Sequence, residues 1–263
     1  MSKRKIDPLT TALAWIAIVV VAGPLLALLV KIPYSHLLSQ IQSNNSLSAI
    51  GLSLWTSALA LLAVIVLGVP LAWWLTHSNQ RLASFIRPIV LAPIALPPTV
   101  AGLALLGFLS RRGLIGTFIY QHTGWQMPFT QSAVIFTGIF IGLPFMVLIT
   151  ESGFTALPRE IEDAATIDRA SGSQLFHLIA IPQARSSIIT GAALAWARIL
   201  GEFGATMMFA GSLPGVTQTW SMQIYQELDL NSDAAYALSL ILLIIALSIV
   251  VLLRRPLREA FSR

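Results

Sequence analysis

Two residues of opposite charge, Arg198 and Glu202, lie four positions apart within a long apolar stretch of the sequence. On a helix this spacing puts both side chains on one face, where they can form an ion pair. Charged side chains in a membrane helix usually face the interior of the protein or a water-filled path. Two interpretations stay open: a structural pair that fixes the orientation of the helix, or a polar element beside a path or gate.

The sequence shows none of the usual catalytic or metal-binding arrangements of cysteine, histidine or lysine. The chain has no cysteine, and its four histidines show no metal-ligand spacing such as H-E-x-x-H. It has no G-x-x-x-x-G-K-[ST] phosphate-binding loop, because none of its lysines (Lys3, Lys5 and Lys31) follows a glycine. We therefore predict no catalytic residue, no metal site and no resident cofactor. Any ATP-Mg would have to be bound by a separate protein.

The composition indicates a membrane protein. Hydrophobic residues make up 56% of the 263 positions and charged residues 10%, against about 25% charged in soluble domains. About 20 apolar residues in a helix cross the 30 Å hydrocarbon core. Blocks of about this length or longer lie at 11–30, 49–76, 88–109, 132–150, 187–210 and 234–253. We predict an all-α polytopic protein with six transmembrane helices, in which a transmembrane domain (11–253) lies between short segments 1–10 and 254–263.

The basic residues predict the orientation, because cytoplasmic loops carry an excess of Lys and Arg. With the N-terminus inside, twelve of them fall on the cytoplasmic side: Lys3, Arg4, Lys5, Arg81, Arg87, Arg159, Arg169, Arg185, Arg254, Arg255, Arg258 and Arg263. Three fall on the other side: Lys31, Arg111 and Arg112. We therefore place both termini and segments 1–10 and 254–263 in the cytoplasm. An error in the third helix would show first at Arg111 and Arg112. The basic residues lie at the ends of the apolar blocks, so the net charge of +5 gives no reason to expect nucleic acid.

Prolines predict a break in the third apolar block. Pro93, Pro97 and Pro98 lie within it, and each removes a backbone donor. Broken backbone at membrane depth is tolerated only where protein or a water-filled cavity covers it. A simple packing kink near Leu96–Thr99 and a role in a path both remain open.

The longest predicted cytoplasmic loop, 151–187, contains two expected short helices. Pro158 can open the first, with acids in its first turns where the helix dipole favours them, and Gly172 can end it. Ser173 can cap the second, at 174–179, before Pro182 stops it. Two such helices beneath a membrane bundle suit docking into a groove on a cytoplasmic partner. The alternative is an ordinary connecting loop.

This loop resembles the coupling loop of bacterial ABC-importer permeases. The matching residues run from Glu162 through Ala164 and Ala165, then Ala170, Ser171, Phe176, Ile179 and Pro182. The resemblance implies that the helix around Phe176 and His177 docks into a cleft of an ATPase subunit, and that Glu162 makes a polar contact there. The glycine of the family pattern falls on Arg169. An arginine at a left-handed turn would cost on the order of 1–2 kcal/mol. Either the helix runs on to Gly172, or Arg169 makes a compensating contact with the partner protein.

Further runs are similar to those of molybdate and related sulfate permeases. They cover 96–102, 111–116, 201–206 and 214–219. Together with the prolines and the charged pair, they suggest pathway or gate residues: Pro97, Pro98, Thr99, Arg198, Glu202, Phe203, Gly204 and Thr206. The hydroxyls of Thr99 and Thr206 would be weak partners for an anion, which suits passage better than tight binding.

The resemblance implies a type I ATP-binding-cassette importer permease, a multi-pass protein of the cell inner membrane that conducts an oxyanion, foremost molybdate. Tungstate and sulfate are the alternatives. The implied partners are an ABC ATPase, a periplasmic oxyanion-binding protein, a second permease copy in a homodimer, and membrane lipid. A self-contained secondary transporter would need several intramembrane acids, whereas Glu202 is the only acid well inside a predicted helix. A structural or assembly role without transport is the third class.

Overall fold

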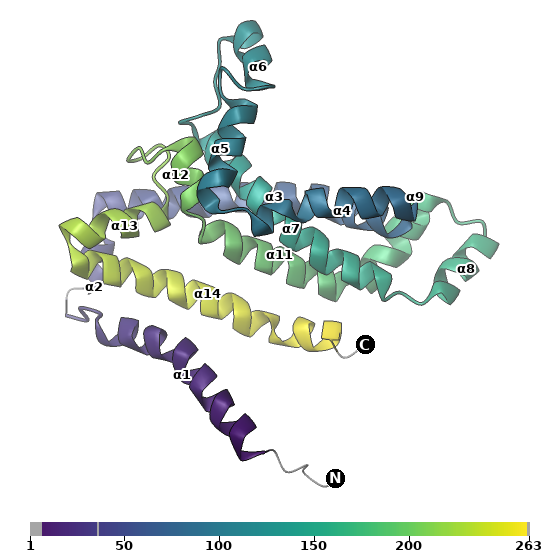
Figure 1. Cartoon of the computed structure of the whole chain (residues 1–263), viewed down its shortest axis with the longest axis horizontal. Coiled ribbons are helices and arrows are strands. Elements are labelled where there is room, and N and C mark those ends of the chain that lie inside the picture. The colour runs from purple at the N-terminus through teal and green to yellow at the C-terminus, as the bar shows by residue number, and fades with distance from the viewer. Residues whose placement is uncertain (1–6, 36, 262–263) are drawn as a thin grey trace.

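A computed structural model describes residues 7–35 and 37–261, which within those ranges form helices and connections (Figure 1). Of the basic residues used for orientation, Lys3, Arg4, Lys5 and Arg263 lie outside them. The helices run in the order α1 (Pro8–Val30), α2 (Leu37–Ile41), α3 (Asn44–His77), α4 (Gln80–Ala95), α5 (Pro98–Leu109), α6 (Gly116–Thr123), α7 (Gln131–Thr155), α8 (Arg159–Ile167), α9 (Gly172–Gln174), the π-helix η1 (Leu175–Ala180), α10 (Ile181–Gln183), α11 (Arg185–Leu200), α12 (Gly204–Ala210), α13 (Trp220–Leu230) and α14 (Ser232–Phe261).

Four helices among the described residues are long and apolar enough to cross a membrane. They are α1, α3, α7 and the part of α14 at Ser232–Ile249. The number rises to six if each of two bent helix pairs counts as one span. The all-α prediction is confirmed, and four of the predicted blocks correspond to continuous helices. Polar side chains begin several of them: Asp7 accepts hydrogen bonds at the start of α1, Ser43 at α3 and Thr130 at α7.

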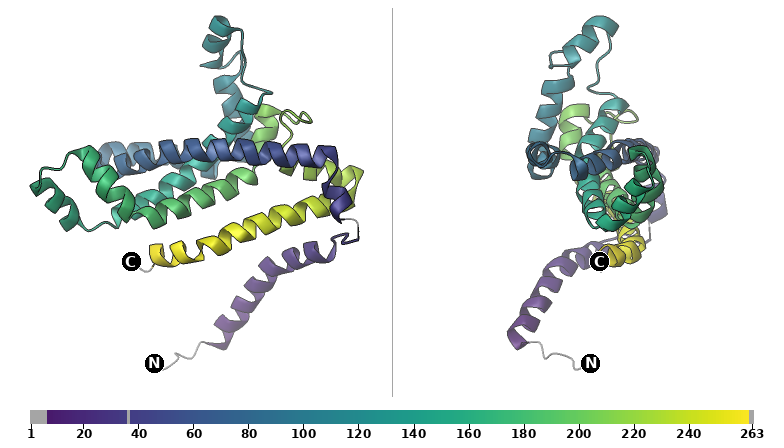
Figure 2. Two further views of the ribbon diagram at one scale, coloured as in Figure 1. Left: turned by 180° about the vertical axis from the view of Figure 1, so that it is seen from behind. Right: turned by 90° about the vertical axis from the view of Figure 1, so that its right-hand side faces the viewer.

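The third apolar block is broken where its prolines predicted. α4 ends at Ala95 and α5 begins at Pro98, and the two helices are bent by 119°. Pro98 occupies the first turn of α5, where its missing N–H leaves no helical bond unmade. The predicted kink or break near Leu96–Thr99 is thus present, and the block at 88–109 forms parts of two helices. α5 and α6 stand away from the long axis of the bundle (Figures 1 and 2).

The fifth apolar block is also broken, which we did not predict. α11 ends at Leu200, residues 201–203 are non-helical, and α12 begins at Gly204. A continuous helix over 187–210 is therefore wrong. The apolar composition persists across the break, so hydrophobicity alone gave no sign of it.

The core of the bundle is formed by α3, α7 and α11, which pack along one another. Small residues let them approach closely. A Cβ atom on Gly138 of α7 would lie 2.8 Å from Cβ of Ala60 on α3 and 3.0 Å from Cγ2 of Ile199 on α11. Close packing of small residues holds membrane helices together where the hydrophobic effect does not.

The two terminal helices run in opposite directions along the bundle (Figures 1 and 2). The end of α1 and the start of α14 lie near α2, and both helices extend from there toward the end that carries α8 (Figures 1 and 2). This places the beginning of α1 and the end of α14 toward one side. That this side faces the cytoplasm stays a prediction.

Substitution of Gly138 by valine should destabilise the bundle. Overpacking of this kind typically costs about 1–3 kcal/mol, so the thermal unfolding midpoint in detergent should fall by several degrees. Gly51→Val is the matched control on α3, because nothing lies within 4 Å of a Cβ atom there. Equal midpoints for the two variants would contradict the close contact.

Candidate functional site

The breaks in the third and fifth blocks lie against each other. A Cβ atom on Gly204 would lie 2.6 Å from Cβ of Pro98, and one on Gly102 would lie 2.9 Å from the carbonyl oxygen of Ala205. α5 and α12 therefore pack as a pair, and this pair lies at one side of the bundle (Figure 1). The structure thus brings together two groups of residues, Pro97–Thr99 and Phe203–Thr206, that lie about a hundred positions apart in the sequence.

Glu202 connects the segments around the second break. The residue is 4% exposed. Its carboxylate pairs with Nη1 of Arg198 at 2.5 Å and accepts the backbone N–H of Ala205 at 2.8 Å, while its carbonyl oxygen accepts the hydroxyl of Ser221 at 2.7 Å. The predicted ion pair is therefore present, although Glu202 lies beyond the end of α11. The same carboxylate caps the start of α12, where an acid also complements the helix dipole.

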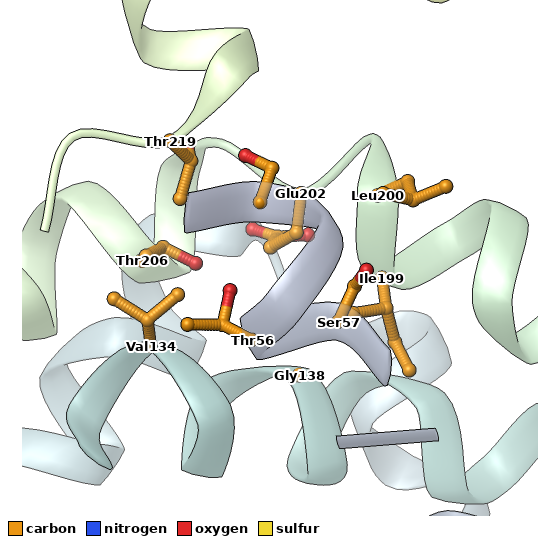
Figure 3. A pocket seen from close by; sticks show the side chains of 10 residues that line it. Thr56, Ser57, Val134, Gly138, Ile199, Leu200, Glu202, Thr206 and Thr219 are labelled. Atoms are coloured by element: carbon orange, nitrogen blue, oxygen red, sulfur yellow. The ribbon is translucent and has the colours of Figure 1, made fainter. Parts of the chain in front are cut away.

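A small polar cavity lies beside Glu202 (Figure 3). Its volume is about 20 Å³, which is room for one water molecule. Thr56 of α3 and Thr206 of α12 point their hydroxyl oxygens toward the carboxylate of Glu202 (Figure 3). The other lining residues are Ser53, Ser57, Val134, Gly138, Ile199, Leu200 and Thr219. The cavity suits a hydrogen-bonded water and is too small for an ion with four oxygens.

Thr99 and Phe203 lie at the edges of this region. Thr99 is exposed in the first turn of α5, beside exposed Pro97 and Pro98. Phe203 is half-buried, and its ring centroid lies 5.1 Å from that of Tyr225 on α13. The pathway residues proposed from the sequence are therefore neighbours, but they do not enclose a common channel within one chain.

The connection between α7 and α11 folds into two short helical segments, as predicted, with different ends. α8 begins directly after Pro158 and ends at Ile167, so Gly172 does not end it. Ser171, not Ser173, caps the next segment, in a capping box with Gln174. Pro182 lies inside that segment, and the chain bends by 74° at Ala184 before α11. We call residues 159–183 the docking segment.

Arg169 adopts the left-handed conformation that the resemblance assigned to a glycine. Its φ is 56°, and the N–H of Ala170 donates to the carbonyl oxygen of Ala165 at 2.9 Å. This bond is the one that closes a Schellman motif, in which the left-handed position usually holds glycine. The first of our two alternatives, a helix that runs on to Gly172, is therefore wrong.

Phe176 faces the interior of the protein. Its ring centroid lies 5.6 Å from that of Trp73 on α3 and 6.3 Å from that of Phe154 on α7. The apolar side chains that the docking segment exposes are instead Ile167, at 81%, and Leu178, at 70%. Of the other residues predicted for coupling, Ala164, His177 and Pro182 are exposed and Ala165 is buried.

An ion pair and a histidine–carboxylate contact lie where the docking segment joins the bundle. Nε2 of His77, at the end of α3, lies 3.3 Å from the carboxylate of Glu162 on α8. Arg87 of α4 donates from Nε and Nη2 to Oε1 of Glu151 on α7, at 2.9 and 2.5 Å. Both pairs line a cavity of about 570 Å³. The sequence interpretation missed Arg87, Glu151 and His77, because each partner lies on a distant helix.

The described residues contain no group of three or more His, Cys, Asp or Glu side chains that could hold a metal ion. The polar features of this part of the chain are thus ion pairs, caps and one hydroxyl-lined cavity. Such features can position helices and contact an anion weakly.

Comparison with known proteins gives consistent matches. Residues 64–255 match the family described as binding-protein-dependent transport system inner membrane component. The chain is 36% identical to the molybdenum transport system permease protein ModB of Mycobacterium tuberculosis, over 89% of this chain and 88% of that protein. It is 32% identical to ModB of Escherichia coli K12, over 78% and 90%.

A solved structure of similar fold is a chain of a bacterial alginate ABC transporter in complex with an alginate pentasaccharide-bound periplasmic protein. The TM-score is 0.76 at 18% identity, over 95% of this chain and 92% of that chain. The MetNI methionine ABC transporter gives a TM-score of 0.63 at 16% identity, over 82% and 96%.

Replacing Arg169 by glycine should stabilise the end of α8. The substitution removes a left-handed penalty of about 1–2 kcal/mol, partly offset by the greater freedom of glycine in the unfolded chain. Amide hydrogen exchange at Ala170 and in the last turn of α8 should slow by about two- to fivefold. Asp168→Gly is the control, because that position has no positive φ and should exchange faster. Faster exchange in Arg169→Gly would show that the arginine side chain stabilises the turn.

Proposed function

The chain belongs to the family of binding-protein-dependent transport system inner membrane components, and from this premise we propose that it is the permease subunit of an ATP-driven molybdate importer. The molybdate assignment rests on the ModB relatives, which share about a third of their residues with this chain over most of its length. The runs at 96–102 and 201–206, which are similar to those of molybdate permeases, lie at the two breaks that pack together.

The observation that carries an ATP-driven mechanism is the docking segment. It is a folded projection at one end of a membrane bundle, tied to α3 through Glu162 and anchored by Phe176. The chain lacks a phosphate-binding loop, so ATP would be hydrolysed by a separate ABC ATPase. The ATPase would grip this segment, and closure of two ATPases around ATP would move two such segments.

The face that contacts the ATPase would be the exposed one. Ile167 and Leu178 supply its apolar surface, and Arg169 projects from the turn between them. Phe176 would act from behind, by fixing the π-helix to Trp73 and Phe154 so that the exposed residues keep their geometry. His177 and Ala164, which are also exposed, would lie within the same contact.

The translocation path would form between two copies of the chain. The cavity beside Glu202 admits one water, whereas molybdate carries four oxygens, so a single chain offers no passage there. The α5–α12 pair exposes apolar side chains such as Val100, Leu103 and Met207. Pairing about a two-fold axis would cover these faces, and the two breaks would then lie beside a shared path or gate.

A periplasmic oxyanion-binding protein would deliver the cargo to the outer face, in line with the description of the family. Tungstate is a tetrahedral dianion of nearly the same size as molybdate, and sulfate is smaller with the same charge. Uptake of labelled molybdate into proteoliposomes that contain the permease, ATPase and binding protein tests the function. Uptake without the ATPase would contradict an ATP-driven importer. If sulfate competes with labelled molybdate better than tungstate does, the transported anion should be assigned as sulfate.

Replacement of Ile167 and Leu178 by aspartate should abolish binding of the ATPase. The two charges would lie in an interface that we expect to be apolar, so the ATPase recovered with tagged permease should fall by about tenfold or more. Leu230→Asp is the control, because Leu230 is similarly exposed at the opposite end of the bundle. Undiminished recovery with the double variant would place the ATPase contact elsewhere.

Replacement of Glu202 by alanine should lower transport more than assembly. Alanine removes both the ion pair with Arg198 and the cap of α12, whereas Glu202→Gln can keep the cap. We expect molybdate uptake to fall about tenfold or more in Glu202→Ala, with the yield of the permease–ATPase complex within about twofold. Equal loss of uptake and yield would instead indicate that the pair serves only to hold the helices.

A further inference from the structure

Arg87 and Glu151 form an ion pair that the proposed function leaves without a role. Glu151 is 8% exposed, and its Oε1 accepts two hydrogen bonds from Arg87, at 2.9 and 2.5 Å. The arginine side chain is 41% exposed. Removing one partner would leave the other charge uncompensated, which is destabilising for a buried carboxylate. The pair therefore sets a specific polar contact between α4 and α7.

The two helices that the pair joins lead to different parts of the molecule. Glu151 lies in the last two turns of α7, and the chain continues from there into the docking segment. Arg87 lies near the middle of α4, which ends at the break before Pro98. Beyond that break, α5 packs on α12. The pair therefore joins the helix that leads to the docking segment to the helix that ends at the break.

A second pair holds the docking segment from another direction. Glu162 of α8 contacts His77 at the end of α3. The cavity of about 570 Å³ separates the helices around the two pairs and is also lined by Arg159 and Ser78. Buried apolar side chains of α3, α4 and α7 pack beside this cavity, and the two pairs add polar contacts between the helices along its wall.

We propose that Arg87 and Glu151 are positioning residues, which transmit displacement of the docking segment to α4 and so to the break in the third apolar block. The proposal rests on the proposed function, because the displacement would be driven by the ATPase. Movement of α7 would pull α4 through the ion pair. The angle at Leu96–Pro97 would then change, and with it the placement of α5 and α12.

Four variants distinguish two roles of the pair: transmitting movement from the docking segment to α4, and only neutralising the buried charge of Glu151. Arg87→Gln and Glu151→Gln each break the pair. Combining the two substitutions removes the pair without leaving a buried charge, and the charge-reversed pair, Arg87→Glu with Glu151→Arg, restores it. Arg81→Gln is the matched control, an exposed arginine on the same helix for which the structure shows no ion pair among the described residues.

The measurement is molybdate uptake per ATP hydrolysed, in proteoliposomes with the ATPase and binding protein. We expect the single and the doubly neutral variants to lower this ratio by about tenfold while ATPase binding is kept, and the reversed pair to restore it to within about threefold. Arg81→Gln should match the unsubstituted protein. A doubly neutral variant with a normal ratio would overturn the proposal, because it would show that only charge neutralisation matters.

A second measurement needs neither ATPase nor cargo, so it tests the pair even if the proposed function fails. The chain has no native cysteine, and Phe85 on α4 and Ile167 on α8 are both exposed. Spin labels on cysteines at these two positions, in nanodiscs, report the distance between the helices. The doubly neutral substitution should broaden that distance distribution. An unchanged distribution would contradict the proposed link between the docking segment and α4.

Discussion

Backbone groups in a bilayer have no water to bond with, and this constraint shapes the molecule. A helix can be interrupted at membrane depth only where its freed N–H and C=O groups find partners within the protein. The two interruptions at Leu96–Pro97 and Gly201–Phe203 lie against each other. At the first, proline removes a donor outright. At the second, Glu202 satisfies the start of α12 and its carbonyl oxygen accepts the hydroxyl of Ser221. The irregular backbone of both breaks thus lies in one region of the molecule.

Two breaks side by side also provide positions where the chain could bend. A continuous hydrogen-bonded helix resists bending, whereas a junction of two half-helices can change angle by rotation about a few backbone bonds. Glycines make the closest approaches across the junctions, Gly204 to Pro98 and Gly102 to Ala205 and Met208. At the other end of the bundle, charged and aromatic side chains fix the docking segment to α3 and α7. The two ends of the bundle thus differ in their contacts: aromatic and charged side chains at the docking segment, and small side chains at the two breaks.

The features that the sequence predicted are those set by local chemistry. Apolar block length gave the helices of the bundle, adjacent prolines gave the first break, and Pro158 gave the start of α8. The second break, at 201–203, was not predicted because it depends on tertiary contacts. These are the packing of α12 on α5 and the hydrogen bond from Ala205 to Glu202 at the start of α12. Gly172 and Ser173 were misassigned for a related reason. Arg169 accepts a left-handed conformation that composition argues against, and this shifts the following cap to Ser171.

The contacts within the candidate site divide in the same way. Arg198 and Glu202 pair across one helical turn, which spacing alone reveals. Arg87 with Glu151 and His77 with Glu162 join helices far apart in the chain, and a single sequence carries no mark of such partners. Phe176 was identified as important from the family pattern, but only the packing on Trp73 shows that its ring points inward.

The contrast between α1 and the α5–α12 pair bears on how the chain is built in the cell. α1 buries none of its residues against the rest of the chain, so it can enter the bilayer as soon as it leaves the ribosome. α5 is synthesised long before α12, the helix on which it packs. Until then its apolar surface and the adjacent proline break lack their cover. Folding in the cell should therefore include a late step in which α12 packs against α5. Before that step, lipid or an insertion factor would have to cover the apolar surface of α5.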